Sequence, residues 1–455
     1  MNYVGTRGFA GDKTFAGALL DGLAPDGGLY VPAEWPTPGF DLSGDYGTLT
    51  QNLLTLFGVD VLGADAVKAA AERTRAAFLR DGEVPLTQLA DNLWMLELWH
   101  GPTLAFKDMA MQMMAPLTDA ALKQRNETLT LVTATSGDTG AAAVRAFAGS
   151  ERVRLVVFHP LGRVSPVQRL QMTTVQADNV LNVGVEGDFD DCQAIVKALL
   201  GDQSLKQNGL ISSVNSINWG RLLGQVPYYL AAAAASGADK PDFVVPTGNF
   251  GDAFAGWVAR RIGGNVGKLH AAVNQNDALN QAINEGRYIR RQAVESASVS
   301  MDVQAPSNFE RLVYEASGRN AATTKALFDT FNATGAVTLS PELQAALKAE
   351  VTASTVNEAQ TAEAIAHAYK AYGQVICPHT AVSLSAALER GLDHPQIVLS
   401  TAHAAKFPDF VTKALGFAPK VPDAIQALYG QPEKITELKN DRVAALDLVK
   451  GFAAA

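Results

Sequence analysis

Residues 128–140 read TLTLVTATSGDTG, a run of β-branched and apolar residues that ends in a loop with two glycines. The alanine-rich segment 141–148 follows, and alanine is the strongest helix former. The pattern predicts a strand, a tight loop and the start of a helix. Backbone N–H groups, the hydroxyls of Ser136 and Thr139, and the positive end of the helix suit a bound carboxylate or phosphate. An ordinary helix N-cap is the alternative.

The same succession of strand and helix recurs along the chain. Strand-like runs at 154–158, 243–247 and 396–401 each border a helical pattern, which predicts an α/β architecture with largely parallel sheets. Residues 1–94 instead mix turns with helical patterns near 49–57 and 66–79, so we expect a separate, mainly helical domain there.

Pattern shifts divide the remainder into domains at 95–235 and 236–455. In the second of these, Thr355 and Glu358 have the spacing of a capping box, and Gly373 is a stop signal for the helix that follows.

Composition excludes several classes of function. The 455 residues are 47% hydrophobic, which is typical of a globular protein with two or three domains. Lys and Arg total 37 against 46 Asp and Glu, a formal charge of -9, so no basic field exists for nucleic acid. We interpret the run Arg287, Arg290 and Arg291 as a solvated helical face and give it no role.

Cysteine and histidine usage narrows the location and the chemistry. Two cysteines, Cys192 and Cys377, without a CxxC pair indicate a reducing compartment, so we expect a cytoplasmic protein. Residues 1–10 lack the pattern of a secretory signal, and the apolar segment 229–235 is too short to span a membrane. The seven histidines are scattered without HExxH spacing, so we expect no metal site.

A second anion-competent loop follows the strand-like run 243–247. Gly248-Asn249-Phe250-Gly251-Asp252 leads into a helical segment at 253–260. The loop matches neither GxGxxG nor GxxxxGK[ST], which argues against a dinucleotide or a P-loop nucleotide. A single phosphate monoester is the better ligand.

Lys107 is the candidate nucleophile. It closes the turn 101–108 and precedes the methionine-rich helical segment 109–114, whose methionines we interpret as core. The positive end of a helix and apolar neighbours both disfavour a protonated amine, so we expect a lowered pKa for Lys107 and the capacity to form a Schiff base. Taken alone, the segment favours a partly exposed lysine in a first helical turn.

Two further segments offer hydrogen-bonding groups. Residues 212–221 are rich in amides and hydroxyls and place Arg221, a bidentate phosphate ligand, six residues after Asn215. An Asn/Ser turn that caps the next helix explains them equally well. Thr401 ends the strand-like run 396–401, where open parallel sheets present ligand groups, but a threonine in that place says little by itself.

Together these segments resemble a known family. The ordered matches are 23–30, 101–108, 135–140, 213–221, 245–252, 306–311, 378–382 and 401–403. In this combination the chain is similar to the threonine synthases of the longer bacterial and fungal type, pyridoxal-phosphate enzymes related to tryptophan synthase β. Ala404 departs from the pattern, because the family is expected to have proline there.

The resemblance implies a fold-type II pyridoxal-phosphate enzyme with two open, mostly parallel sheet domains and a mainly helical N-terminal domain. Lys107 would hold pyridoxal 5'-phosphate, and Thr401 would face its pyridine nitrogen. Asp138 falls where relatives place a polar side chain near the 3-hydroxyl group. The cofactor phosphate would be bound by Gly248, Asn249, Phe250, Gly251 and Asp252.

The resemblance also implies the substrate, O-phospho-L-homoserine. Ser136, Gly137 and Thr139 would bind its carboxylate, and Asn215, Ser216 and Arg221 its phosphate. The implied reaction is γ-elimination of phosphate followed by β-hydration to L-threonine, the last step of threonine biosynthesis, with Lys107 as the base.

Two alternatives stay open. One is a phospholyase of the same chemistry that releases 2-oxobutyrate, and the other is a noncatalytic protein that binds an amino acid or the cofactor. The sequence also leaves open whether the protein is a monomer or a homodimer, and whether Cys377 or His379 contacts the cofactor.

Overall fold

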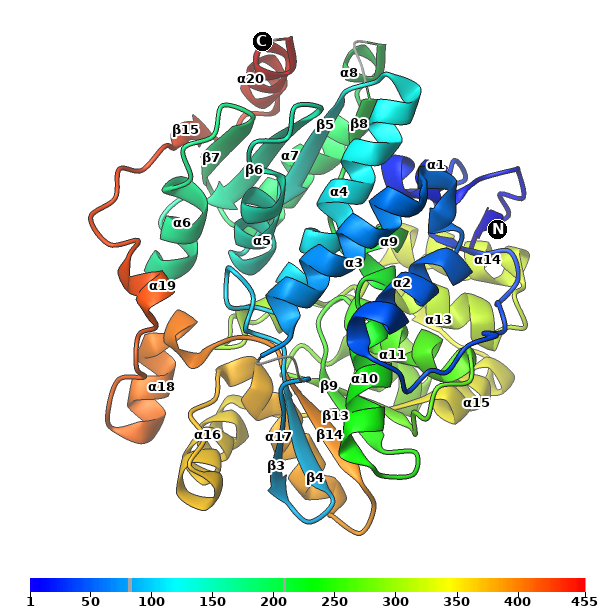
Figure 1. Ribbon diagram of the computed structural model, residues 1–455, viewed down its shortest axis with the longest axis vertical. Coiled ribbons are helices and arrows are strands. Elements are labelled where there is room, and N and C mark those ends of the chain that lie inside the picture. The colour runs from blue at the N-terminus through cyan, green and yellow to red at the C-terminus, as the bar shows by residue number, and fades with distance from the viewer. Residues whose placement is uncertain (81–83, 208–209, 455) are drawn as a thin grey trace.

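The computed structural model describes residues 1–80, 84–207 and 210–454. Its two main lobes are each built on a largely parallel sheet with helices on both faces, and the helical N-terminal segment lies beside them (Figure 1). The predicted α/β architecture is therefore confirmed. No helix in these ranges is both long enough and apolar enough to cross a membrane.

The upper lobe in Figure 1 contains a five-stranded, all-parallel sheet in the order β15-β7-β6-β5-β8. Its strands are β5 (Leu129–Ala134), β6 (Val153–Pro160), β7 (Val180–Glu186), β8 (Leu210–Ser212) and β15 (Thr436–Lys439). The helices of this lobe are α4 (Lys107–Arg125), α5 (Asp138–Phe147), α6 (Pro166–Thr173), α7 (Phe189–Gly201), α8 (Gln203–Gln207) and α20 (Arg442–Ala454). Both predicted strands of this region, 128–135 and 154–158, are present as β5 and β6.

The lower lobe contains a six-stranded sheet in the order β13-β10-β9-β14-β4-β3, antiparallel only at β3. Its strands are β3 (Leu86–Ala90), β4 (Leu93–Glu97), β9 (Asp242–Pro246), β10 (Leu269–Val273), β13 (Val351–Thr355) and β14 (Gln396–Ser400). The surrounding helices are α9 (Trp219–Leu223), α10 (Val226–Ser236), α11 (Gly251–Arg261), α12 (Ala278–Glu285), α16 (Glu358–Tyr372), α17 (Pro378–Arg390), α18 (Pro408–Leu415) and α19 (Asp423–Gln426). Short 3-10 turns lie at η2 (Val299–Met301) and η3 (Ala404–Lys406).

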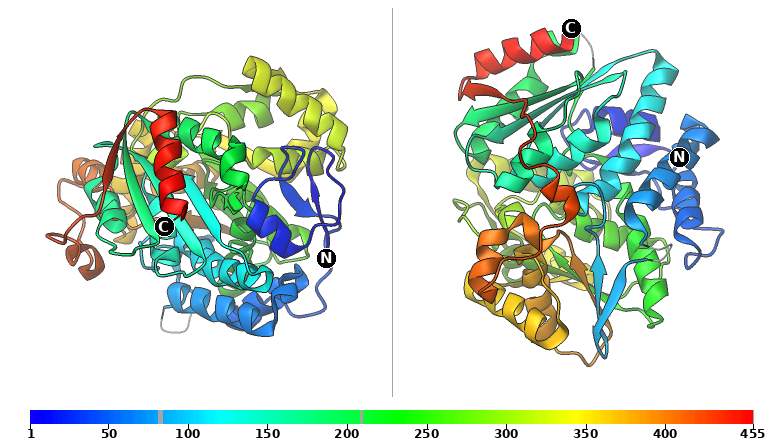
Figure 2. Two further views of the ribbon diagram at one scale, coloured as in Figure 1. Left: turned by 90° about the horizontal axis from the view of Figure 1, so that it is seen from above. Right: turned by 60° about the vertical axis from the view of Figure 1, so that its left-hand side comes forward.

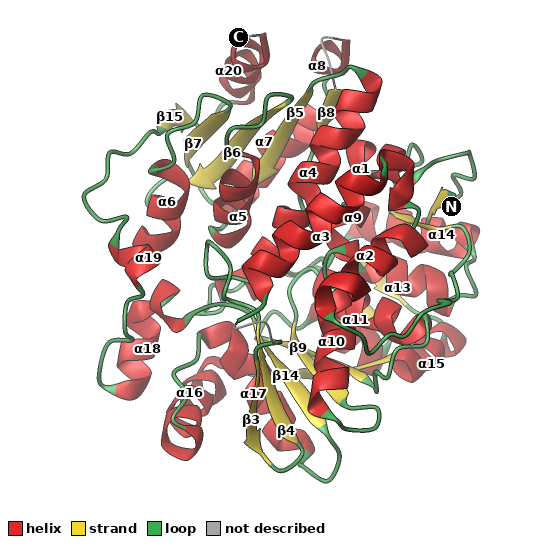
Figure 3. Ribbon diagram, in the orientation of Figure 1, coloured by secondary structure: helices red, strands yellow, loops and turns green. Residues whose placement is uncertain are grey.

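The N-terminal segment is mainly helical, as expected. It consists of β1 (Tyr3–Gly5), α1 (Phe15–Asp21), β2 (Tyr30–Pro32), α2 (Tyr46–Leu56), η1 (Val59–Leu62) and α3 (Ala64–Phe78). A further group at the right of Figure 3 comprises β11 (Arg287–Ile289), α13 (Phe309–Ala316), α14 (Ala321–Thr334), β12 (Ala336–Thr338) and α15 (Pro341–Glu350). Trp219 of α9 is fully buried and joins the N-terminal segment to the rest of the fold, because its ring packs against Tyr3 and Phe57 and its indole N–H donates to the Tyr3 hydroxyl.

The domain division predicted at residues 95 and 235 stays a prediction. Strand β4 spans residue 95, and each sheet takes strands from segments that the division assigns to different domains. β4 pairs with β14 in the lower sheet, whereas β15 returns from the lower lobe to pair with β7 in the upper one. Figure 2 shows this return as the orange-to-red segment that ends in α20.

Two local predictions are wrong. The helix that ends at Gly373 is capped by Asn357, which forms a capping box with Gln360, because Thr355 still belongs to strand β13. The arginine run is not on a helix either. Arg287 begins strand β11, which ends at Ile289, and Arg290 and Arg291 lie in the coil that follows the strand.

Candidate active site

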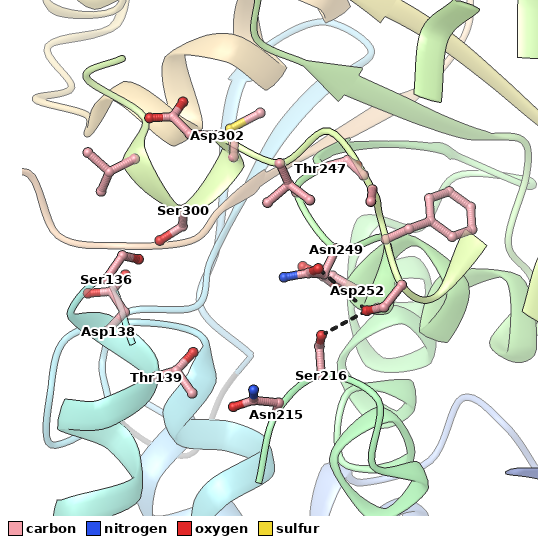
Figure 4. A pocket seen from close by; sticks show the side chains of 18 of the residues that line it. Ser136, Asp138, Thr139, Asn215, Ser216, Thr247, Asn249, Asp252, Ser300 and Asp302 are labelled. Carbon is pink, nitrogen blue, oxygen red and sulfur yellow. Dashed lines mark hydrogen bonds between the residues drawn. The ribbon is translucent and has the colours of Figure 1, made fainter. Parts of the chain in front are cut away.

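The carboxyl ends of β5, β8, β9 and β14 surround one cavity of about 450 Å³ between the two sheets (Figure 4). Ligand sites in open parallel sheets lie at this end of the strands. The cavity is lined by most of the predicted site residues: Lys107, Ser136, Asp138, Thr139, Asn215, Ser216, Arg221, Gly248, Asn249, Phe250, Gly251, Asp252 and Thr401. Gly137 lies between Ser136 and Asp138 as the N-cap residue of α5.

Lys107 is the first residue of α4 and is only 8% exposed, so the partly exposed alternative is wrong. Its Nζ lies 3.1 Å from Oδ2 of Asp138 and donates to Oγ of Ser300 at 3.3 Å. Burial lowers the pKa of Lys107, the Asp138 carboxylate opposes the shift, and Arg221 adds to it. The lowered pKa that the sequence predicted is therefore present, with burial as its main cause.

Asp138 is held by three donors. Besides Lys107, Nε2 of Gln168 donates to its Oδ1 at 2.8 Å, and Nζ of Lys406 lies 2.8 Å from the same oxygen. Burial alone would raise the pKa of Asp138, but Lys107 and Lys406 hold it well below its usual range. Asp138 is thus an ionised carboxylate between two lysines.

The loop after β5 is shaped by Thr135 rather than by an N-cap hydroxyl. Oγ1 of Thr135 accepts from the N–H groups of Gly137 and Gly140, both at 2.9 Å. Gly137, the N-cap residue of α5, has φ 139° and, as a glycine, has no side chain with which to cap the helix. The hydroxyls of Ser136 and Thr139 are consequently not used as helix caps, which favours a ligand over the N-cap alternative.

The loop after β9 is a close-fitting cradle. A Cβ atom at Gly248 would collide with the carbonyl oxygen of Ser300, whose side chain contacts the Lys107 amine. Phe250 has a left-handed backbone, φ 63°, and α11 begins at Gly251, so the first-turn N–H groups have no intrahelical partner. Ser300 therefore lies between Lys107, which its side chain contacts, and the loop 248–252, which its carbonyl oxygen approaches at Gly248.

Asp252 is turned toward two tyrosines. The hydroxyls of Tyr228 and Tyr229 both donate to its Oδ1, while its buried Oδ2 has no hydrogen-bond partner among residues 1–80, 84–207 and 210–454. Burial raises the pKa of Asp252 to about 6, against the opposing effect of the two tyrosine hydrogen bonds.

Arg221 is a buried cation that no carboxylate of the described residues pairs with in an ion pair. Its Nη1 donates to the carbonyl oxygen of Val214 at 3.0 Å and its Nη2 to Oγ1 of Thr139 at 3.4 Å. Burial lowers its pKa to about 10. A charged guanidinium that faces a cavity in this way is a ready receptor for an anion.

Asn215 and Ser216 lie on the same wall as Arg221. Oδ1 of Asn215 accepts from the Thr133 hydroxyl at 2.6 Å, and Oγ of Ser216 lies 3.5 Å from Oγ of Ser307. The turn also caps α9, but through Asn218, whose side chain accepts from Gly220 N. The capping interpretation is therefore confirmed for Asn218, and the ligand role of Asn215, Ser216 and Arg221 stays a prediction.

Thr401 lines the cavity at the end of β14, and its carbonyl oxygen accepts from the N–H of Phe106, next to Lys107. His379 also lines it and accepts through Nε2 from the N–H of Ser300 at 3.2 Å. Burial lowers the pKa of His379 to about 3, so its ring is neutral near pH 7. Cys377 instead caps α17 through Thr380.

Sequence reasoning missed several residues of the site. Gln168, Ser300, Ser307 and Lys406 contact predicted site residues, and Arg290 and Arg291 line the cavity. Ser307 lies inside the matched segment 306–311 and Lys406 lies three residues after the matched segment 401–403, but neither was assigned to the site. Arg290 and Arg291 belong to the arginine run that was given no role, and Gln168 and Ser300 come from segments without a local signature.

The residues present fit pyridoxal phosphate. A buried amine of lowered pKa, a glycine cradle at a helix N-terminus and a strand-end hydroxyl lie around one cavity. A family model described as "Pyridoxal-phosphate dependent enzyme" matches residues 79–400. The fold and the site thus define the class: the chain is a fold-type II pyridoxal-phosphate enzyme.

Models described as "Threonine synthase N terminus" and "Threonine synthase, C-terminal" match residues 2–74 and 380–450. The chain is 41% identical to the threonine synthase of Pseudomonas aeruginosa over 97% of its own length and 96% of that protein. The chain belongs to the threonine synthase family.

Solved structures agree. The pyridoxal-phosphate-bound threonine synthase of Brucella melitensis is 41% identical, with a TM-score of 0.94 and full coverage of both chains. The yeast threonine synthase is 32% identical, with a TM-score of 0.91 over 99% of this chain and 98% of that one.

Proposed function

We propose that the protein converts O-phospho-L-homoserine and water into L-threonine and phosphate, as a carbon–oxygen lyase in the last step of threonine biosynthesis. The observation that carries the proposal is that one cavity is lined both by the buried Lys107 amine and by an Arg221 guanidinium with no carboxylate partner among the described residues. The first suits a covalent cofactor and the second a phosphorylated substrate.

Lys107 would hold the cofactor through its amine, with Gly248, Asn249, Phe250, Gly251 and Asp252 around the cofactor phosphate. Thr401 would face the pyridine nitrogen and Asp138 the 3-hydroxyl side. Bound there, pyridoxal phosphate supplies an electron sink for charge that develops at the substrate's α-carbon. The neutral His379 ring adds no positive charge to this wall.

Arg221, Asn215 and Ser216 would grip the substrate phosphate as it leaves. Oδ1 of Asn215 is occupied by the Thr133 hydroxyl, so the amide N–H groups of Asn215 are left to donate into the cavity. Arg221 supplies a planar fork of donors, which matches a phosphate better than a point charge does.

Ser136, Gly137 and Thr139 would bind the substrate carboxylate at the N-terminus of α5, whose dipole favours an anion. This places the substrate between the carboxylate loop and Arg221. Nζ of Lys107, freed from the cofactor, would then remove the α-proton, because its lowered pKa keeps a larger share of the amine neutral near pH 7.

The same residues would serve a phospholyase that releases 2-oxobutyrate, since the two reactions differ in the placement of water. Absorption spectra with and without O-phospho-L-homoserine, followed by identification of the products, test the proposal. Threonine and phosphate in equal amounts support it. Dominant 2-oxobutyrate overturns it in favour of the phospholyase, and an unchanged spectrum without product favours a noncatalytic binder.

We further propose that the protein works in the cytoplasm on this small molecule, as a monomer or a homodimer. Two free, buried cysteines suit a reducing compartment. Sedimentation of the purified holoenzyme would distinguish the two assembly states.

A further inference from the structure

Lys406 is a charged side chain with no exposed surface. It ends the turn η3, its Nζ donates to the carbonyl oxygen of Thr103 at 2.7 Å, and the same nitrogen lies 2.8 Å from Oδ1 of Asp138. Removing an ammonium from water costs several kcal/mol unless a well-placed anion compensates it. The burial of the Lys406 ammonium beside the site must therefore be compensated by a nearby anion.

The compensating anion is Asp138, which Lys406 shares with Lys107. Its two oxygens face two ammonium groups, Lys107 on Oδ2 and Lys406 on Oδ1, and Gln168 is the one neutral side-chain donor that the described residues supply. Lys107 must be uncharged whenever it acts as a nucleophile or a base. Without Lys406, the Asp138 carboxylate would then be a buried anion supported only by an amide.

We propose that Lys406 is a positioning residue: a second counter-ion that keeps Asp138 ionised and in place whenever the Lys107 amine is uncharged. Two like charges held against one carboxylate repel each other, so Lys406 also favours release of the proton from Lys107. The inference rests on the proposed role of Lys107 in holding the cofactor.

Other charged or titratable groups face this cluster from every neighbouring element, namely Asp108 on α4, Arg221 on α9, Asp252 on α11, Cys377 and His379 on α17, and His403 before η3. Asp108 is another buried carboxylate on which the charge of Lys406 acts. Its two oxygens are already bound by the N–H and the hydroxyl of Thr103, each at 2.8 Å. Asp138 is therefore the carboxylate that Lys406 balances.

The test is a pH titration of the cofactor's visible absorption in the holoenzyme of the parent, K406M and K406R. Methionine keeps the length of the side chain and removes its charge, whereas arginine keeps the charge. We expect the titration midpoint to move up by about one pH unit or more in K406M, because loss of a nearby positive charge favours the protonated form of Lys107. K406R should titrate close to the parent.

An unchanged midpoint in K406M that retains its cofactor would overturn the inference and leave Lys406 a structural role only. If K406M does not retain the cofactor, thermal melting of K406M and of the double variant D138N/K406M decides. Recovery of most of the lost Tm in the double variant supports a charge pair, and no recovery overturns it. Failure of the proposed function is distinct, since the parent itself would then show no visible absorption from a lysine-bound cofactor.

Discussion

Arg221→Met should affect substrate binding and protein stability differently, because this guanidinium lines the cavity and forms no ion pair within the part of the chain that the structure describes. A charge-assisted hydrogen bond contributes about 1.5–3 kcal/mol, and a fork makes two of them. Loss of about 3–6 kcal/mol lowers kcat/KM for O-phospho-L-homoserine by about 10²–10⁴-fold.

The free energy of unfolding of the cofactor-free protein should respond differently. Burial lowers the pKa of Arg221 to about 10, and each pKa unit corresponds to about 1.4 kcal/mol, so the charged form costs about 3 kcal/mol. Its two hydrogen bonds, to Val214 and Thr139, are also donated by a charged group and return about 1.5 kcal/mol each, so they offset most of this cost. We therefore expect the free energy of unfolding of R221M to lie within about 2 kcal/mol of that of the parent.

The assay combines steady-state kinetics with urea unfolding and with thermal melting in inorganic phosphate. In the holoenzyme, where the cofactor would occupy the loop 248–252, phosphate should raise the Tm of the parent and leave that of R221M unchanged. The control R221K keeps the charge but loses the fork, and should fall between the two in kcat/KM. A loss of more than about 2 kcal/mol of stability in R221M, together with unchanged kinetics, would refute the assignment and make Arg221 a structural residue.

Three further outcomes are expected. K107A should lose the covalent cofactor link, measured by borohydride reduction and mass spectrometry, together with turnover; retained turnover would disprove the lysine assignment. G248A should weaken cofactor affinity about tenfold or more in a fluorescence titration, because its Cβ would meet the carbonyl of Ser300, whereas the control G201A, with open space around its Cβ, should not. In the cofactor-free protein, D252N should be about 1–3 kcal/mol more stable than the parent at pH 8, since burial raises the pKa of Asp252 to about 6 and the folded parent must deprotonate a buried carboxyl. That advantage should disappear as the pH falls from about 6 to about 4, and an advantage independent of pH would contradict the reasoning.

Strands and loops were predictable from sequence because their signals are local. The β-branched run at β5 and the glycines after it encode a strand and a turn within a dozen residues. The capping box at Thr355 and Glu358 was wrong for the same reason. The spacing is correct, but pairing of β13 with β10 extends the strand through Thr355 and leaves the cap to Asn357.

The cavity itself was harder to predict, since it depends on contacts between distant segments. No pattern near Ser300 or Lys406 indicates that the two side chains approach Lys107 and Asp138. Burial of Lys107 likewise follows from tertiary packing, so its own segment suggested partial exposure. The matched family segments identified the predicted site residues along the sequence, but only the fold shows that they line one cavity.

Strand β15 pairs with β7 although more than 200 residues separate the two in sequence. During synthesis on the ribosome, the edge of β7 stays unpaired until the chain has completed the entire lower sheet. An open parallel edge is a template for association with other chains, so the nascent protein passes through a stage at which aggregation competes with folding. The nascent chain should therefore depend most on chaperones before residues 436–439, which form β15, have left the ribosome.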